Sequence, residues 1–296
     1  MKKYKDIKKN PIAIIAFIAP GFLVFTFLVL KPIVEAFIMS TSRWTSITTT
    51  RFVGLSNYAR LLSSGQFWNS MRVSLIYMFG ATILQVLIGF SLGYFLYLEF
   101  KGYKFFRTAL FAPATLLTVG VGFMWSFIFS PRIGLWRYFL EVIGLRELYT
   151  PLISQPNTAL LIVILAHVWR FSGISIILFN SGFQNMPSSV LEMAEIDGAT
   201  GWKKLIHILI PLSFETSKTI LILTMIGALR AFDLVYAMTS GGPLGGTDVL
   251  PMHMFRQAFQ NFNIGMGAAV AVLIFILAMT LTAIINNISI NEGVEY

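Results

Sequence analysis

Long apolar runs recur along this chain, and each is long enough to cross a lipid bilayer. A helix needs about 20 predominantly apolar residues to span the hydrocarbon core. The runs meeting this requirement lie at 12–39, 73–98, 109–129, 158–183, 219–238 and 264–288. The pattern predicts an all-α integral membrane protein with six transmembrane helices.

The polar segments between these runs predict the rest of the organisation. Residues 53–72 and 134–147 combine helical spacing with a mixed apolar and polar face. This pattern is typical of interfacial helices, although ordinary packed loop structure fits it equally well. We therefore expect a basic amino terminus (1–11), a six-helix transmembrane domain (12–290) with a large loop at 184–218, and a short tail (291–296).

Lysine positions give the orientation of the chain in the membrane. Ten of the eleven lysines fall in the amino terminus, the 99–108 turn and the 184–218 loop. Because short cytoplasmic loops carry an excess of basic residues, these segments and both termini are expected in the cytoplasm. Lys31 is the exception, and we expect it at the outer end of the first helix, where its stem can snorkel. Arginine is less biased, so the orientation depends on lysine.

Composition excludes a soluble fold and weakens other functional classes. Hydrophobic residues make up 56% of the 296 residues, charged residues 12%, and the mean hydropathy is +0.75. A soluble domain could not bury so much apolar surface. The net charge of +9 is explained by the cytoplasmic lysines, so nucleic acid is not an expected partner.

Motifs for covalent chemistry and for nucleotide binding are absent from the sequence. No Gly-x-x-x-x-Gly-Lys-Ser/Thr segment occurs, so any ATP must be handled by another polypeptide. His167, His207 and His253 lack metal-ligand spacing, and the chain has no cysteine. We expect a non-catalytic protein without a cofactor or metal of its own.

One cytoplasmic segment predicts a helix, a sharp bend and a second helix. Ser189 stands three residues before a glutamate, which is capping-box spacing for a first helix between residues 188 and 197. Gly198 can end that helix in a left-handed conformation. A second helix is expected from Thr200, as N-cap, to Pro211. Such a rigid knob suits a groove on a partner protein, although a simple amphipathic connector fits the same pattern.

The same segment resembles a known loop, the Glu-Ala-Ala-x-x-Asp-Gly-Ala sequence of binding-protein-dependent ABC importer permeases. Met193 replaces the first alanine and Leu205 stands where phenylalanine is usual. In that family the loop is the coupling helix, which docks on the ATPase subunit. The resemblance implies this role for Glu192, Ala194, Asp197, Gly198 and Ala199.

Two further segments resemble the sugar-type subgroup of this family, in particular the first of its two permease subunits. These are Phe-Val-Gly-Leu-Ser-Asn-Tyr at 52–58, and Phe-Asp followed by Thr-Ser-Gly-Gly-Pro within 232–243. The resemblance implies a type I importer permease fold in a bacterial or archaeal cytoplasmic membrane. It also implies a second permease subunit as heterodimer partner, cytoplasmic ATPase subunits that bind ATP and Mg²⁺, and an extracytoplasmic sugar-binding protein.

Polar residues inside the spans are candidates for the transport path, because ionisable groups there usually face a cavity or a partner. His167 and Arg170 lie three residues apart, on one face of the fourth span. By resemblance to maltose-type relatives, we expect the path to be bordered by His167, Arg170, Phe171, Ile174, Thr224, Gly227 and Ala228. Alternatively, Arg170 and Arg230 lie near the outer interface or pair with Asp233 or the other subunit.

The sequence leaves the cargo and the energy source partly open. A neutral sugar or oligosaccharide is the favoured cargo of an ATP-driven importer. An anionic one, such as a uronic-acid oligosaccharide or a sugar phosphate, becomes the alternative if Arg170 faces the cavity. Two rivals from other classes are an ion-coupled secondary transporter and a membrane-embedded transferase, for which no catalytic cluster is seen.

Overall fold

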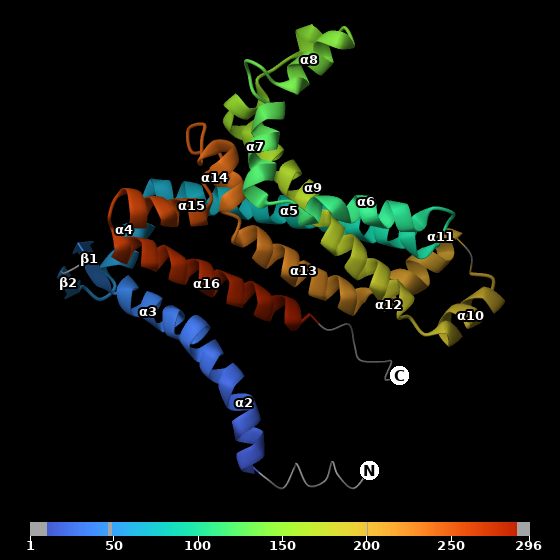
Figure 1. Cartoon of the computed structure of the whole chain (residues 1–296), viewed down its shortest axis with the longest axis horizontal. Helices are drawn as coiled ribbons and strands as arrows, with labels where there is room; N and C mark the ends of the chain where they lie inside the picture. Colours follow the sequence, from blue (N-terminus) through green and yellow to red (C-terminus); the bar gives the residue numbers. More distant parts are fainter. Residues whose placement is uncertain (1–10, 47–48, 200, 289–296) are drawn as a thin grey trace. The chain divides into compact units, whose positions relative to one another are not determined.

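A computed structural model of the chain describes residues 11–46, 49–199 and 201–288 and is mainly helical (Figure 1). The predictions for residues 1–10, for the 291–296 tail and for the N-cap Thr200 lie outside the described residues. The chain divides into two compact units. One comprises residues up to 63 together with 254–273, and the other comprises 64–253 together with the chain from 274 onward.

The first unit starts with an apolar helix that is continuous apart from one π-helical turn. Its elements are α2 (Pro11–Phe25), the π turn η1 (Thr26–Leu30), α3 (Lys31–Ser40), strands β1 (Ser42–Ser46) and β2 (Thr49–Phe52), and α4 (Ser56–Leu62). The π turn η5 (Arg256–Gln260) and the first part of α16 (Ile264–Asn286) also belong here. The antiparallel β1–β2 hairpin was not expected, so the prediction of a purely helical chain missed one small element.

The second unit contains the remaining helices. Its elements are α5 (Gly65–Tyr97), α6 (Tyr103–Thr115), α7 (Thr118–Ile128), α8 (Leu135–Val142), the short turns η2 (Arg146–Leu148) and η3 (Leu152–Ser154), α9 (Pro156–Gln184), α10 (Ser188–Ile196), α11 (Gly201–Lys204), η4 (Leu205–Leu209), α12 (Ile210–Leu212), α13 (Phe214–Leu229) and α14 (Asp233–Thr239). Helix α15 (Leu250–Phe255) and α16 continue from one unit into the other.

Six spans are present if two bent helix pairs count as one span each. Among the described residues, four helices are long and apolar enough to cross a membrane: 14–40, 65–97, 156–184 and 264–286. These agree with the first, second, fourth and sixth predicted spans. The bent pairs are α6 with α7, at 96°, and the 205–212 segment with α13, at 59°.

The predicted span at 109–129 is not one continuous helix, because the chain leaves the helix between α6 and α7. Leu116 and Leu117 are extended, with ψ of 149° and 127°. Pro113 in the last turn of α6 has no amide hydrogen to continue the helical ladder. Hydropathy cannot reveal such a break, since the residues on both sides remain apolar.

The prediction of a fifth span at 219–238 is also wrong in its bounds. Helix α13 ends at Leu229, and α14 begins only at Asp233 after a short non-helical link. Residues 214–218, before the predicted start, are already helical. Arg230 and Asp233 are both exposed, and no ion pair joins them in the part of the chain that the structure describes.

The predicted interfacial segments are helical in part. Residues 134–147 contain α8, whereas 53–72 hold the short helix α4 and then the first turns of α5. Helix α5 therefore starts eight residues before the predicted span at 73–98, capped by Ser64, whose Oγ accepts from the amide of Phe67 at 3.4 Å. Lys31 does not end the first helix, which continues to Ser40, and Lys31 pairs with Glu35 at 3.6 Å.

Close packing of α5 against α9 organises the second unit (Figure 1). Gly89 and Gly93 of α5 form a Gly-x-x-x-Gly pair that lies directly against Ser175, Ile176 and Phe179 of α9. Small residues at this spacing let helices approach closely in a membrane. Gly173 of α9 lies equally close to the backbone of α6.

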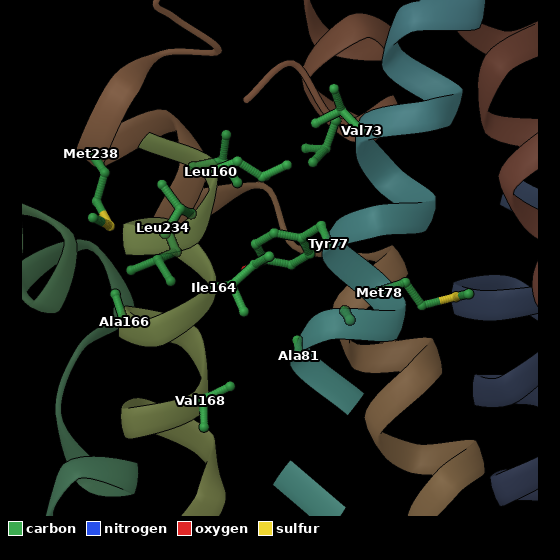
Figure 2. Close-up of a cluster of buried hydrophobic side chains, with 14 of the residues drawn as sticks. Val73, Tyr77, Met78, Ala81, Leu160, Ile164, Ala166, Val168, Leu234 and Met238 are labelled. Atoms are coloured by element: carbon green, nitrogen blue, oxygen red, sulfur yellow. The ribbon is translucent and has the colours of Figure 1, made fainter. Parts of the chain in front are cut away.

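Toward their other ends these helices share a buried apolar core (Figure 2). Tyr77 and Ala81 of α5 are fully buried, and Ile164 of α9 is 5% exposed. Leu234 and Met238 bring α14 into the same cluster. The core therefore fixes the faces that α5 and α9 turn toward each other.

Buried Asn57 organises the first unit at the 52–58 motif. Its amide nitrogen donates to the carbonyl oxygens of Ser40 at 2.8 Å and Ser42 at 3.0 Å. Tyr58 donates to the hydroxyl of Ser40 at 2.7 Å. The Asn-Tyr part of this motif thus ties α4 to the end of the first span.

Candidate functional site

A pocket of about 280 Å³ opens between α5, α9 and α13. It is called the interhelical pocket here, and its lining residues are Gln85, His167, Phe171, Ile174, Ser175, Leu178, Ile220, Leu223, Thr224 and Gly227. Ligand pockets of this kind are mainly apolar with a few polar groups that fix orientation. The arrangement can hold a small molecule within the membrane-spanning part of the unit.

Five of the seven residues predicted for the transport path line this pocket: His167, Phe171, Ile174, Thr224 and Gly227. They recur at helical spacing on α9 and on α13, which places each set on one face. The α9 set and the α13 set meet across the pocket because the two helices pack together.

His167 is enclosed by aromatic rings on one side of the pocket. Its ring centroid lies 4.7 Å from that of Phe171 and 5.3 Å from that of Tyr77. His167 is only 4% exposed. The pocket therefore offers an aromatic surface beside an imidazole that can donate or accept a hydrogen bond.

Arg170 and Ala228, the other two predicted path residues, do not line the interhelical pocket. The Nη1 of Arg170 donates to the carbonyl oxygen of Ala114, in the last turn of α6. Its guanidinium carbon lies 4.7 Å from the ring centroid of Phe171. Arg170 thus gives a hydrogen bond to a carbonyl oxygen next to the α6–α7 bend. Ala228 is 3% exposed and belongs to the apolar core.

Gln85 is a pocket residue that the sequence analysis missed. It lies on α5, whereas the predicted path residues came only from the fourth and fifth spans. A carboxamide in the middle of an otherwise apolar 73–98 run was the available signal. Ser175 on α9 was missed in the same way.

The coupling segment has the predicted helix and bend. Helix α10 covers 188–196, and Gly198 has φ of +74°. The amide of Ala199 donates to the carbonyl oxygen of Ala194 at 2.9 Å, which is the closing bond of a Schellman cap. The predicted capping box is not formed as expected, because α10 begins at Ser188 and Ser189 is inside its first turn.

The coupling residues differ in exposure. Glu192, Asp197 and Gly198 are exposed, Ala199 is half-buried, and Ala194 is 7% exposed. Ala194 therefore packs against its own chain, while the other four leave surface available to a partner. Figure 1 shows α10 beyond the end of α9, followed by the chain's return through α11 and α12.

The second helix does not stop at Pro211 as predicted. Pro211 lies inside α12, and the turn before it, η4, is π-helical. The amide of Ile210 donates to the carbonyl oxygen of Leu205, five residues back. Because a π turn shifts the bonding pattern, the chain passes the proline and bends only before α13.

Together, the bent and straight spans, the interhelical pocket and the exposed α10 define a class of protein. They fit a membrane-embedded transport subunit that offers a rigid helix to a partner. The family described as "Binding-protein-dependent transport system inner membrane component" matches residues 85–290. The chain belongs to this family and is a multi-pass permease subunit of an ABC importer.

Relatives from bacteria and archaea match over nearly the whole chain. It is 30% identical to the probable ABC transporter permease protein YurN of Bacillus subtilis, covering 93% of this chain and 95% of that protein. It is also 30% identical to the trehalose/maltose transport system permease protein MalF of Thermococcus litoralis, with 95% and 94% covered. The sn-glycerol-3-phosphate transport system permease protein UgpA of Agrobacterium fabrum is 30% identical, with 90% of each chain covered.

A solved structure shares the fold. A chain of the bacterial alginate ABC transporter, in complex with its alginate pentasaccharide-bound periplasmic protein, superposes with a TM-score of 0.79. The sequence identity is 20%, and 98% of this chain and 97% of that chain are covered. This likeness confirms the type I permease fold, and the family match confirms the class of ABC importer permeases in place of an ion-coupled carrier.

Proposed function

We propose that this chain forms half of a sugar translocation path. The observation that supports this proposal best is the interhelical pocket. Its lining is mainly apolar, with the ring of Phe171 and a few uncharged polar groups, which suits a molecule with apolar ring faces and some hydroxyl groups. The trehalose/maltose system named for one relative supports this class of cargo, whereas the sn-glycerol 3-phosphate system named for another carries an anionic polyol phosphate. A second permease subunit forms the other half of the path.

The rest of the proposed transporter lies outside this chain. An extracytoplasmic binding protein delivers the sugar, and cytoplasmic ATPase subunits bind ATP and Mg²⁺. The chain resides in a bacterial or archaeal cytoplasmic membrane with both termini inside, an orientation supported by its lysine positions.

Helix α10 is the proposed docking element for the ATPase. Its end is already fixed by the Ala199 to Ala194 hydrogen bond, so little conformational entropy is lost on docking. Gly198 has open space around it, because a side chain there would meet no atom of this chain within 4 Å. Glu192 and Asp197 supply exposed carboxylates for charged hydrogen bonds to the partner. Movement of the ATPase is then transmitted to the spans, which alternate between two openings.

A neutral cargo is favoured over an anionic one. Arg170 already donates to the Ala114 carbonyl, and the interhelical pocket has no carboxylate, lysine or arginine in its lining. A cation facing the cargo would be the expected feature of a path for acidic sugars.

Two substitutions at Gly198 test the coupling role. Gly198→Asn keeps the left-handed conformation, which asparagine tolerates, and adds little bulk. Gly198→Trp adds a large group at a position where a Cβ would meet no atom of this chain within 4 Å, and it also strains the backbone at φ of +74°. The measurements are membrane insertion, copurification of the ATPase subunit, and ATP-dependent sugar uptake. We expect both variants to insert, and only Gly198→Trp to lose the ATPase or its coupling. Full transport by Gly198→Trp would refute the docking role.

A further inference from the structure

Gln85 is the residue that α5 contributes to the interhelical pocket. It lies one turn before Gly89, which packs directly against α9. The Gly89 contact holds this part of α5 against Ser175, which also lines the pocket. The position of the carboxamide in the wall is therefore set by helix packing.

The carboxamide of Gln85 is buried without a full set of partners. The residue is 2% exposed, and its Nε2 has no hydrogen-bond partner among the described residues. An amide nitrogen carries two donors, and nearly all buried polar groups in proteins are paired. A group left unpaired in the wall of a pocket is a sign of a ligand that completes it.

Two other polar groups on α5 are also buried without a hydrogen-bond partner among the described residues. They are the hydroxyls of Tyr77 and Thr82. The ring of Tyr77 reaches His167 on α9. Gln85 thus ends a short polar strip on a helix that otherwise reads as apolar.

The polar groups around Gln85 are uncharged or, like His167, able to be neutral. Thr224 donates to the carbonyl oxygen of Ile220 at 2.9 Å, which leaves its oxygen free to accept. Ser175 is 2% exposed, and Phe171 presents a ring. This set matches hydroxyl groups, which both donate and accept, better than phosphate or carboxylate groups.

We propose that Gln85 binds the cargo directly, through hydrogen bonds between its carboxamide and a hydroxyl group of a neutral sugar that lies against Phe171 in the interhelical pocket. The inference builds on the proposed function, because it takes the pocket to be part of the sugar path. It adds α5 to the elements that select the cargo.

Uptake by the assembled transporter in proteoliposomes gives the first test. The probes are maltose, trehalose and lactose as neutral sugars, and sn-glycerol 3-phosphate and an alginate trisaccharide as acidic ones. Gln85→Leu keeps the approximate volume and removes the hydrogen bonds. We expect it to lower uptake of the transported neutral sugar about 3- to 10-fold, the loss of one neutral hydrogen bond, with ATP hydrolysis in the absence of sugar unchanged. The matched control is Gln184→Leu, at the exposed end of α9, which should retain normal uptake.

Thiol labelling separates direct contact from a structural effect. The chain has no cysteine, so Gln85→Cys introduces a unique thiol in this subunit. Because residue 85 is 2% exposed in this structure, labelling reports the states that open the pocket during ATP hydrolysis. We expect N-ethylmaleimide to label Gln85→Cys under these conditions, and a saturating concentration of the transported sugar to slow the labelling at least several-fold. Gln184→Cys should be labelled equally with and without sugar.

The possible results distinguish a failure of the proposed function from a failure of the role of Gln85. If the wild type takes up no sugar with ATP, both the proposed function and this inference are refuted. If it takes up only the acidic probes, the chain still forms part of an uptake path, but the neutral assignment and this inference are both wrong. Normal uptake by Gln85→Leu, or labelling of Gln85→Cys that sugar does not change, overturns the role of Gln85 alone.

Discussion

Substituting Gly89 with alanine tests whether close packing of α5 against α9 sets the shape of the pocket. A Cβ at this position would lie 2.7 Å from the Cβ of Ser175 and 3.1 Å from Cδ2 of Phe179. Carbon atoms in favourable contact are about 3.5–4.0 Å apart, so the helices would have to separate by roughly 1 Å. The backbone carbon of Ser175, at 3.2 Å, cannot move without its helix.

The magnitude follows from two opposing terms. Overpacking in a filled interior costs about 1–3 kcal/mol, and alanine in place of glycine in a helix returns about 0.5–1 kcal/mol. We therefore expect a net loss of up to about 2.5 kcal/mol in the free energy of unfolding, centred near about 1 kcal/mol. Each 1 kcal/mol corresponds to roughly 2–4 °C in Tm for a large domain. Uptake should fall as well, because Ser175 lines the interhelical pocket.

Thermal unfolding of the detergent-solubilised protein, followed by tryptophan fluorescence, measures the effect. Gly120→Ala in α7 is the matched control, since the nearest atom to its Cβ would be 3.9 Å away. It should leave Tm unchanged or slightly raised. Equal Tm values for the two variants, or a more stable Gly89→Ala, would show that the close approach does not govern stability.

Three other substitutions test particular contacts, each by Tm and by uptake. Arg170→Ala should lower stability by about 1–3 kcal/mol because the carbonyl of Ala114 loses its donor, and should reduce uptake of neutral and acidic sugars by the same factor; a loss confined to acidic sugars would contradict this. Asn57→Ala should cost about 1–3 kcal/mol, since two backbone carbonyls lose their donor; an unchanged Tm would count against it. Ser74→Ala removes the acceptor of the Leu250 amide, a 2.6 Å bond, and should destabilise similarly while a threonine at 74 restores most of the loss.

The α6–α7 bend is a feature that could not be predicted from the sequence. Hydropathy averages over about 20 residues, so a two-residue extended link inside an apolar run leaves it unchanged. Pro113 cannot donate to the helical ladder, and Arg170, more than fifty residues later in the chain, donates to the carbonyl of Ala114 beside the bend. Arg170 was predicted to be a path residue because the sequence shows which helix face it shares with His167. The sequence does not show that its hydrogen-bond partner is Ala114.

The break after α13 was missed for a related reason. The 230–232 link contains two apolar residues and fits a continuous span by composition. In the structure α14 packs against α7, a contact between segments more than a hundred residues apart. Periodicity along one helix carries no information on such a partner.

The sequence by itself determined the four long apolar spans, the α10 helix and the bend at Gly198. Each depends on local properties: apolar length, backbone hydrogen bonding within a few residues, and the freedom of glycine at positive φ. Only the tertiary structure decided which polar residues meet. It brought Gln85 together with His167 and Thr224 and turned Arg170 away from the pocket, because the direction of a side chain depends on the helix packed against it.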